Sequence, residues 1–344
     1  MKQLDLVYLS DVSPKDKVWD KSRGATDGFK ALYEDTDYHK YAFRMGECSC
    51  YLEFAFAVDD NGVCNLKLQT ARFCRVRLCP VCQGRRALMW TAKTIKIMPK
   101  VLEANPKARF IMLMLSVRNC PLPELKTTLS DMHKAYRKLI QRKDWKVQGW
   151  VRTTEVTRGK DDTAHPHYHC LLMVKPSYFT GANYISQAQW VELWKECLKV
   201  SYDPIVYVQA VHPKKGACEL WQESPVMAAL VEVIKYTVKP SDVLRGDDCQ
   251  LPGQRVKVTD QEWLLELTKQ LYRTRAIATG GILKEYLKVL EDEPEDLIHA
   301  DENGEVEADT ESPRVMFDWN GRNQRYRMNP EAVDQDSEQL VEVQ

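Results

Sequence analysis

Residues 146 to 174 read KVQGWVRTTEVTRGKDDTAHPHYHCLLMV, and they contain the pattern from which the fold is predicted. Lys146 to Thr157 alternates apolar and polar side chains, a pattern that predicts a β-strand. His165 to Val174 predicts a second strand, and the polar residues 158–164 between the two predict a turn. Two strands joined by a short turn pair antiparallel, so the sequence predicts a hairpin inside an antiparallel sheet.

Further elements lie on both sides of this hairpin. Strands are predicted at Phe110–Val117 and Ile205–Val211, and helices at Leu122–Gln141, Ser186–Val200, Pro225–Val238, Asp260–Tyr272 and Gly281–Leu290. The resulting order is β-α-β-β-α-β followed by helices. This order predicts an α+β protein of the split βαβ (ferredoxin-like) type, in which helices pack on one face of an antiparallel sheet.

Length and composition describe an ordinary globular protein. The 344 residues are 44% hydrophobic and 28% charged, which is enough for one large core or two smaller ones. The sequence has no run of 18 apolar residues and no apolar stretch at its N-terminus, so we expect a cytoplasmic protein. We expect a partly ordered N-terminal segment (1–45), a cysteine-rich region (46–100), a core domain (101–245), C-terminal helices (246–290) and a flexible acidic tail (291–344).

The net charge of zero hides an asymmetry. The stretch from Glu291 to Gln344 holds 17 acidic and 4 basic residues, a balance of −13, so the preceding residues carry +13. A basic body with an acidic tail suits a protein that binds nucleic acid. The alternative is a solvated body with a disordered tail.

Three histidines alternate along the second strand of the hairpin. His165, His167 and His169 share one face of a strand, and neutral imidazole is a common ligand of divalent metals. With residues 158–164 as the loop, Glu155 lies opposite His167 and completes a site of two histidines and one carboxylate for Mg²⁺ or Mn²⁺. A register slip of one residue would turn Glu155 away. The alternatives are solvated or core histidines and a surface carboxylate.

A tyrosine lies near the end of the helix predicted over residues 225–238. Glu232 and Tyr236 are four residues apart and therefore neighbours on a helix, with Lys239 three residues further on the same side. A tyrosine flanked by a carboxylate and a cation has the surroundings of a nucleophile, because a cation favours the phenolate. The alternative is a tyrosine packed in a helix interface beside a surface Glu–Lys pair.

The cysteine-rich region predicts a structural zinc site. The chain has 11 cysteines and no signal peptide is expected, so thiols or metal ligands are favoured over disulfides. The ligands predicted for zinc are Cys48, Cys74, Cys79 and Cys82, with Cys50 as a substitute for Cys48. The alternative is four reduced structural cysteines. Arg85 and Arg86 come shortly after Cys82 in the sequence, where they suit phosphate binding.

These motifs resemble one family when they are taken in order. The matching stretches are Phe110–Asn119 (FIMLMLSVRN), Arg152–Thr157 (RTTEVT), His165–His169 (HPHYH), Glu232–Lys239 (EVIKYTVK), Cys79–Cys82 (CPVC) and Gly280–Lys284 (GGILK). Over residues 46 to 290 the chain resembles the HUH (His-hydrophobic-His) endonucleases, and among them the single-tyrosine replication initiators of rolling-circle plasmids. The first strand departs from the Thr-rich form of that family, with Met114 and Ser116 instead.

The resemblance implies a set of roles for the site residues. It implies that His167 and His169 bind the metal, that Glu155 is the third ligand, and that His165 supports them from a variable position. It also implies that Tyr236 nicks DNA and that Glu232 activates water.

The resemblance also implies partners. It implies binding to a double-stranded plasmid origin and to single-stranded DNA, and cooperation with a host helicase and polymerase.

Competing functions come from other classes. A transposase or relaxase would share the chemistry, and a non-catalytic DNA-binding protein would keep the metal site as a structural feature. A cupin-like oxygenase also uses His-x-His with a carboxylate, but it needs a barrel of many short strands, whereas long helices separate the strands predicted here.

Overall fold

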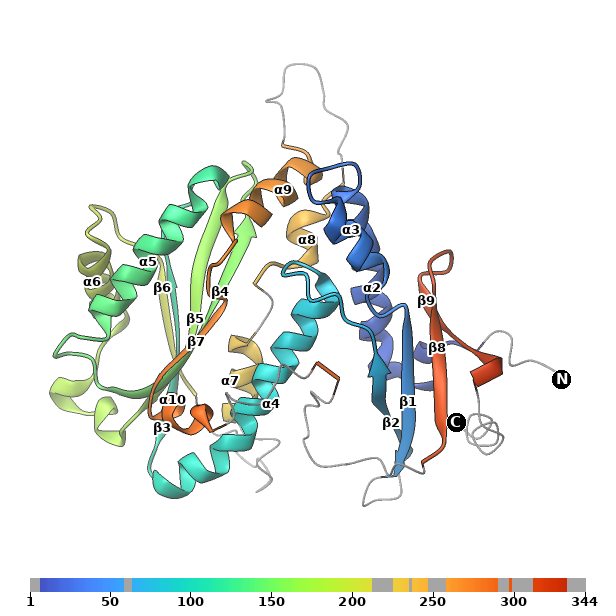
Figure 1. Ribbon diagram of the computed structural model, residues 1–344. Helices are drawn as coiled ribbons and strands as arrows, with labels where there is room; N and C mark the ends of the chain where they lie inside the picture. Colours follow the sequence, from blue (N-terminus) through green and yellow to red (C-terminus); the bar gives the residue numbers. More distant parts are fainter. Residues whose placement is uncertain are drawn as a thin grey trace. The chain divides into compact units, whose positions relative to one another are not determined.

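The computed structural model describes residues 7–58, 64–211, 225–234, 237–246, 258–289, 297–298 and 312–332. The chain divides into two compact units, the first made of Met1–Met89 with Glu295–Gln344 and the second of Trp90–Pro294. Helix α4 (Pro80–Ala104) begins in the first unit and ends in the second (Figure 1). No helix among the described residues is long and apolar enough to cross a membrane.

The second unit is built on a five-stranded antiparallel sheet. Its strands are β3 (Arg109–Ser116), β4 (Val147–Arg158), β5 (Ala164–Val174), β6 (Val206–Val211) and β7 (Ile277–Gly281). The strand order is β6-β3-β5-β4-β7, so β5 lies between β3 and β4. The predicted order of strands and helices is therefore present, with β7 as an additional edge strand beside β4.

Helices cover both faces of this sheet, whereas the sequence predicted helices on one face. The two crossover helices, α5 (Leu125–Leu139) and α6 (Gln187–Leu198), lie on one side and α7 (Pro225–Val233) on the other (Figure 1). Tyr136 of α5 contacts Tyr168, with ring centroids 5.9 Å apart, while the Thr153 hydroxyl on the opposite face donates to the Val233 carbonyl at 2.6 Å. The reason is that most of β5 is buried on both faces, and such a strand needs cover on both sides.

The described residues in the C-terminal part of the second unit form three more helices. They are α8 (Pro240–Val243), α9 (Asp260–Gln270) and α10 (Ile282–Lys288). Thr259 caps α9, because its hydroxyl accepts from the Glu262 amide and the Glu262 carboxylate accepts from the Thr259 amide. The two helices predicted near the end of this unit are thus present, each slightly shorter than predicted.

The first unit joins the two ends of the sequence. Its helices are α1 (Leu9–Val12), α2 (Lys17–Tyr33) and α3 (His39–Gly46), and its strands are β1 (Tyr51–Val58), β2 (Cys64–Ala71), β8 (Arg314–Asn320) and β9 (Arg325–Met328). The strand order is β2-β1-β8-β9. Short 3₁₀ turns occur at Pro14–Asp16, Leu122–Glu124, Pro176–Phe179, Gly181–Asn183 and Pro330–Ala332 of the two units.

The sequence predicted a flexible tail from residue 291, and this prediction is wrong for the residues that form β8 and β9. Val315 and Phe317 alternate along β8 and are buried, and the Phe317 ring lies 6.1 Å from that of Phe54. Because acidic residues dominate the composition of this region, the short apolar alternation did not lead to a predicted strand. Residues 1–45 are also more regular than predicted, since α2 alone has 17 residues.

Candidate active site

The register of the β4–β5 hairpin places Glu155 directly opposite His167. Thr157 pairs with His165 in the same ladder, as the predicted loop requires. Directly opposed residues share a face of the sheet, so the carboxylate and the imidazoles project to the same side. The predicted register is therefore confirmed.

The side chains of Glu155, His167 and His169 meet at one point. Glu155 Oε2 lies 3.2 Å from His167 Nε2 and 2.8 Å from His169 Nε2. The three candidate ligand atoms lie within 4.8 Å of one another. Glu155 is 3% exposed and His167 8%, so the group sits in the protein rather than on a solvated surface.

The protonation pattern of His167 fits a cation at this point. Its Nδ1 lies 3.2 Å from the His165 carbonyl, and because a carbonyl only accepts, Nδ1 carries the proton. In the neutral ring Nε2 is then an acceptor, and it faces the acceptor Oε2 of Glu155. Two facing acceptors need a proton or a metal ion between them, and nitrogen and oxygen donors of this kind suit divalent metals.

His165 supports this group and is not part of it. Its ring centroid lies 5.2 Å from that of His167, and its carbonyl orients the His167 ring. Burial lowers the pKa of His165.

Lys239 forms an ion pair with the carboxylate. Its Nζ lies 2.7 Å from Glu155 Oε1, so the two oxygens of Glu155 face different partners. Burial alone would raise the pKa of Glu155, but contacts with His167, His169 and Lys239 hold it well below its ordinary value. The same ion pair raises the pKa of Lys239.

Tyr236 and Lys235 lie outside the described residues, but the chain on either side of them is placed. Val233 accepts from Thr153, and the Thr237 carbonyl accepts from the Val156 amide at 2.8 Å. The segment that contains Tyr236 is therefore bound at both ends to β4, the strand that carries Glu155.

The helix predicted through Val238 ends earlier, at Val233. Lys239 is the N-cap of α8 and does not share a helix with Glu232, which is a correction to the predicted helical stripe. Glu232 lies exposed in the last turn of α7, close enough to Lys239 to add to the rise in the pKa of that lysine, after Glu155 and Asp242. The Thr237 carbonyl accepts from the Val156 amide of β4. Helical periodicity in the sequence does not indicate such a contact.

A clamp centred on Arg158, which the sequence did not predict, connects β4 to the chain that follows α8. The buried Arg158 guanidinium contacts both Asp162 and Asp260 at 2.7 Å. Asp260 also accepts from the backbone amides of Arg245 and Gly246, at 2.8 and 3.0 Å. The clamp joins the end of β4 to the residues that follow α8. A Thr-x-x-Glu capping box identifies the start of α9 in the sequence, but nothing there indicates its partner Arg158.

The hydroxyl of Ser116 serves the backbone. Ser116 lies opposite His167 on β3, yet its hydroxyl donates to the Ile205 carbonyl at 2.9 Å. This bond ties β3 to the start of β6.

The first unit gathers four thiols at a second point. The sulfur atoms of Cys48 and Cys82, Cys74 and Cys82, and Cys79 and Cys48 are 3.6, 3.6 and 3.7 Å apart. Tetrahedral zinc with Zn–S bonds of about 2.3 Å separates its sulfurs by about 3.8 Å, so the spacing fits. It is too long for a disulfide, and all four cysteines are buried and free. Cys50 is not in the group.

Backbone amides surround these sulfurs. The Cys74 amide points to Cys48 Sγ at 3.4 Å and the Arg75 amide to Cys82 Sγ at 3.3 Å. Arg75 has a left-handed backbone, with φ of 55°, which turns its amide inward. Although burial opposes ionisation, S–H donors from its three neighbours hold the pKa of Cys79 well below its ordinary value. The same contacts raise the pKa of Cys48. Full ionisation of the group therefore requires a cation.

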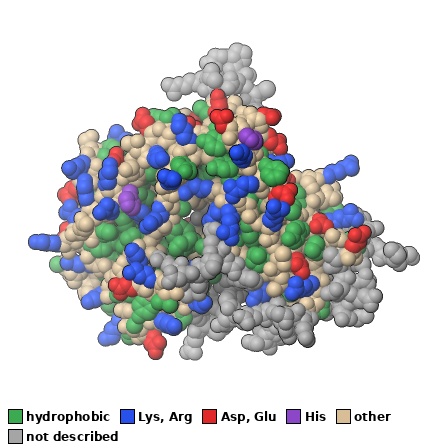
Figure 2. Space-filling model, in the orientation of Figure 1, with side chains coloured by type: hydrophobic (Ala, Val, Ile, Leu, Met, Phe, Trp, Pro, Cys, Tyr) green, Lys and Arg blue, Asp and Glu red, His purple; other side chains and the backbone are tan. Residues whose placement is uncertain are grey.

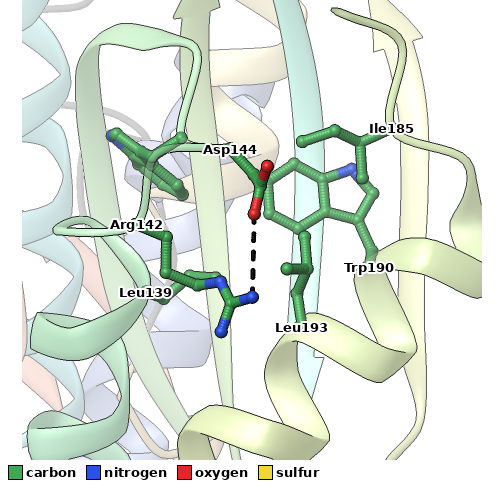
Figure 3. Close-up of a pocket in the computed structure, with 7 residues that line it drawn as sticks. Leu139, Arg142, Asp144, Ile185, Trp190 and Leu193 are labelled. Atoms are coloured by element: carbon green, nitrogen blue, oxygen red, sulfur yellow. Dashed lines mark ion pairs between the residues drawn. The ribbon is translucent and has the colours of Figure 1, made fainter. Parts of the chain in front are cut away.

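The hollow in Figure 3 does not belong to either group. It lies between α5 and α6, where Trp190, Leu193 and Ile185 surround the ion pair of Arg142 with Asp144 at 3.6 Å. Those helices cover the face of the sheet opposite the histidines, so the hollow has no access to Glu155.

Comparisons with known proteins identify a family. A family model described as "Replication protein" matches residues 65–327. "Protein rep" of Streptococcus pneumoniae serotype 2 is 31% identical over 323 residues, which are 91% of this chain and 92% of that relative. "Protein rep" of Lentilactobacillus hilgardii is 35% identical and covers 83% and 87%, and that of Bacillus amyloliquefaciens is 40% identical and covers 74% of each chain. No solved structure matches.

Proposed function

We propose, since this chain belongs to the replication-protein family, that it initiates plasmid replication by nicking one strand of the origin through Tyr236. The observation that carries the proposal is the convergence of Glu155, His167 and His169 within 4.8 Å on one face of the sheet. This arrangement supports an HUH endonuclease with a divalent metal, Mg²⁺ or Mn²⁺. The strand order β6-β3-β5-β4 supports the split βαβ fold of that class.

Glu155, His167 and His169 would hold the metal, and their rigid hairpin would fix its place. When bound, the metal supplies positive charge that polarises the scissile phosphate. The ion pair of Lys239 with Glu155 Oε1 leaves Oε2 facing the two imidazoles. Lys239 thus holds one oxygen of the carboxylate, and the other oxygen would be the one available to the metal.

Tyr236 performs the covalent step. Its Oη attacks phosphorus and loses its proton, the bond from phosphorus to the 3′-oxygen breaks, and that oxygen takes up a proton. The products are a 5′-phosphotyrosine and a free 3′-OH that primes synthesis. The contacts of Val233 and Thr237 with β4, on either side of Tyr236, support its place at this site.

Release of the 5′ end needs a second reaction. Reversal of the first step rejoins strands, and hydrolysis of the phosphotyrosine frees the protein. Glu232, exposed in the last turn of α7, would accept a proton from the attacking water in this hydrolysis. The four cysteines of the first unit would hold a structural zinc ion.

A single-stranded oligonucleotide containing the origin nick site, incubated with the protein and Mn²⁺, tests the proposal. We expect a covalent protein–DNA adduct and a shorter strand with a 3′-OH. DNA binding without cleavage or adduct would support a non-catalytic DNA-binding protein instead. An adduct lost in Tyr236→Phe but kept in Tyr207→Phe would identify the nucleophile, since Tyr207 is an exposed tyrosine of the same unit.

A further inference from the structure

We propose that Tyr207 and Arg118 hold single-stranded DNA beside the candidate metal site, Tyr207 by stacking on a base and Arg118 by binding a phosphate. Both residues belong to the second unit, which also carries Glu155, His167 and His169. The inference rests on the proposed function, because it takes the strand cut at this site as the bound partner.

Tyr207 lies in the same row of the sheet as His169. It pairs with Met114 across β6 and β3, and Met114 pairs with His169 across β3 and β5. Directly opposed residues share a face, so the Tyr207 side chain projects to the side of the sheet that carries the histidines. Two strand spacings separate Tyr207 from His169 at the backbone, about 10 Å. A strand bound at the metal site therefore passes close to Tyr207.

The row ends at an exposed edge of the sheet. Strand β6 is the edge strand (Figure 1), and on it Tyr207 is 50% exposed and Ile205 65%. The Tyr207 hydroxyl donates to Gln209 Oε1 at 3.2 Å, which restrains the ring while half of the side chain stays open to solvent. Exposed aromatic rings are the surfaces on which proteins stack the bases of single strands.

Arg118 supplies a positive charge at the same end of the sheet. Ser116 pairs with His167 at the end of β3, and Arg118 follows two residues later. The Arg118 guanidinium lies over the Tyr202 ring, 4.1 Å from its centroid. The Arg118 amide donates to the hydroxyl of the same tyrosine at 3.1 Å. Two contacts with one tyrosine, just before β6, thus hold Arg118 in place.

The charge of Arg118 has no acidic partner in the part of the chain that the structure describes. Asp203, the acid next to Tyr202 in the sequence, pairs with Lys195 at 2.6 Å instead. Arg118 is exposed, and a guanidinium that stacks on an aromatic ring keeps its N–H groups at the rim, where they can donate to a phosphate.

Charge alone does not locate the bound strand, because Figure 2 shows Lys and Arg side chains scattered over the visible face of the molecule. An exposed ring together with an unpaired guanidinium is more specific. The bases of a duplex are stacked on one another inside the helix, whereas a single strand presents both base faces and phosphates to a protein. The surface around Tyr207 and Arg118 therefore fits a single strand better than a duplex.

Binding of the full-length protein to a labelled single-stranded oligonucleotide that contains the nick site, measured by anisotropy with no divalent ion added, tests the inference. Tyr207→Ala should bind about tenfold more weakly, the loss expected for one base stack. Tyr207→Phe keeps the ring and should restore most of the affinity. The slope of log affinity against log salt should stay unchanged in Tyr207→Ala and fall by about 0.7 in Arg118→Ala, because only the arginine contacts a phosphate.

Oligonucleotides that each lack one base near the nick identify the partner of the ring. For the wild type, removal of the stacked base should weaken binding about tenfold, as removal of the ring does. In Tyr207→Ala the same abasic site should weaken binding little further, because the stack is already absent. Coupling at one position indicates a direct contact between the base and the ring.

Tyr184→Ala is the matched control. Tyr184 is a tyrosine of the same unit with nearly the same exposure, 51%, but it lies between β5 and α6, next to Ile185 of the hollow in Figure 3. Its loss should leave single-strand affinity within about twofold. Tyr207→Ala should likewise leave the affinity for a duplex within about twofold, since paired bases are not free to stack on the ring.

Three results would overturn the inference. One is unchanged single-strand affinity in Tyr207→Ala, and another is an equal loss in Tyr207→Phe, which would assign the effect to the hydroxyl. The third is a loss in Tyr207→Ala that is independent of every abasic site. An adduct formed by the wild type together with any of these results would reject this surface and leave the proposed nicking intact. If the wild type makes no adduct but its single-strand binding depends on the Tyr207 ring, nicking fails while the surface stands.

Discussion

Nε2 of His169 lies closer to Oε2 of Glu155, at 2.8 Å, than does Nε2 of His167, the residue directly opposite, at 3.2 Å. The Glu155 carboxylate therefore leans along the hairpin toward its diagonal neighbour and reaches both rings. A carboxylate of this length can do so because diagonal neighbours on a sheet are about 7–8 Å apart at the backbone. One acidic side chain thus contacts both imidazoles.

The first prediction concerns these ligands. His167→Ala and His169→Ala should each lower the rate of origin nicking by at least about a hundredfold, because each removes one of three groups that position the metal. Nicking of a labelled oligonucleotide under single-turnover conditions measures the loss. Duplex binding should change little, since phosphate contacts dominate affinity for DNA.

His165→Ala is the matched control on the same strand. It keeps the backbone carbonyl that orients His167 and removes a ring outside the ligand group, so nicking should fall by less than about tenfold. Wild-type rates in both ligand variants would refute the metal site.

The second prediction concerns zinc. Metal analysis of the purified protein should find about one zinc ion per chain, and Cys79→Ser should lose it and destabilise the first unit. Zinc should also leave as the pH falls, because protons compete for the thiolates. Cys50→Ser is the control, since Cys50 lies outside the group and should keep the ion. A protein that contains no zinc and folds equally well in chelator would contradict the assignment.

The third prediction concerns the C-terminal strands. Phe317→Ala should lower the free energy of unfolding by about 3–5 kcal/mol, because it empties a buried position between β8 and β1. Chemical denaturation measures this change. Arg314 lies in the same strand as Phe317 and forms a partly exposed ion pair with Glu53 of β1. Arg314→Ala removes this ion pair and should cost less than about 1 kcal/mol. Equal and small effects would mean that the strand contributes little.

Local patterns predicted the second unit well. The hairpin register followed from the position of one polar loop, and loop length fixes which residues face each other. The pairing of Glu155 with His167 needed no other information. The order of strands and helices followed in the same way, because each of these elements is long and periodic.

Long-range contacts set the limits of prediction. Helix α7 ends at Val233, and the Val156 amide of β4 donates to the Thr237 carbonyl, a bond that no local pattern encodes. The sequence did not predict the short strand β7, whose last residue, Gly281, is also the first residue of the helix predicted over 281–290. Strand β8 pairs with β1 across most of the sequence and β9 pairs with β8, so only the alternation of Val315 and Phe317 could have indicated them.

The final prediction distinguishes the roles of Tyr236 and Glu232. Tyr236→Phe keeps the ring and removes the nucleophilic oxygen, so both nicking and the protein–DNA adduct should disappear. Glu232→Ala removes the carboxylate proposed to activate water. First cleavage and the adduct should then persist while hydrolysis fails, so adducts accumulate. Denaturing gels of the reaction with time measure both species.

The structure sharpens this test through Lys239. Helix α7, which carries Glu232, ends at Val233, so helical spacing gives no ground for Glu232 to orient the tyrosine. If Glu232 acts instead through Lys239 and the Glu155 ligand, Glu232→Ala should slow the first cleavage as well and weaken the dependence on Mn²⁺. Equal loss of cleavage and hydrolysis in Glu232→Ala would reject water activation and leave Tyr236 as the nucleophile. An adduct formed by Tyr236→Phe would reject the nucleophile itself and direct the search to Tyr202 or Tyr207.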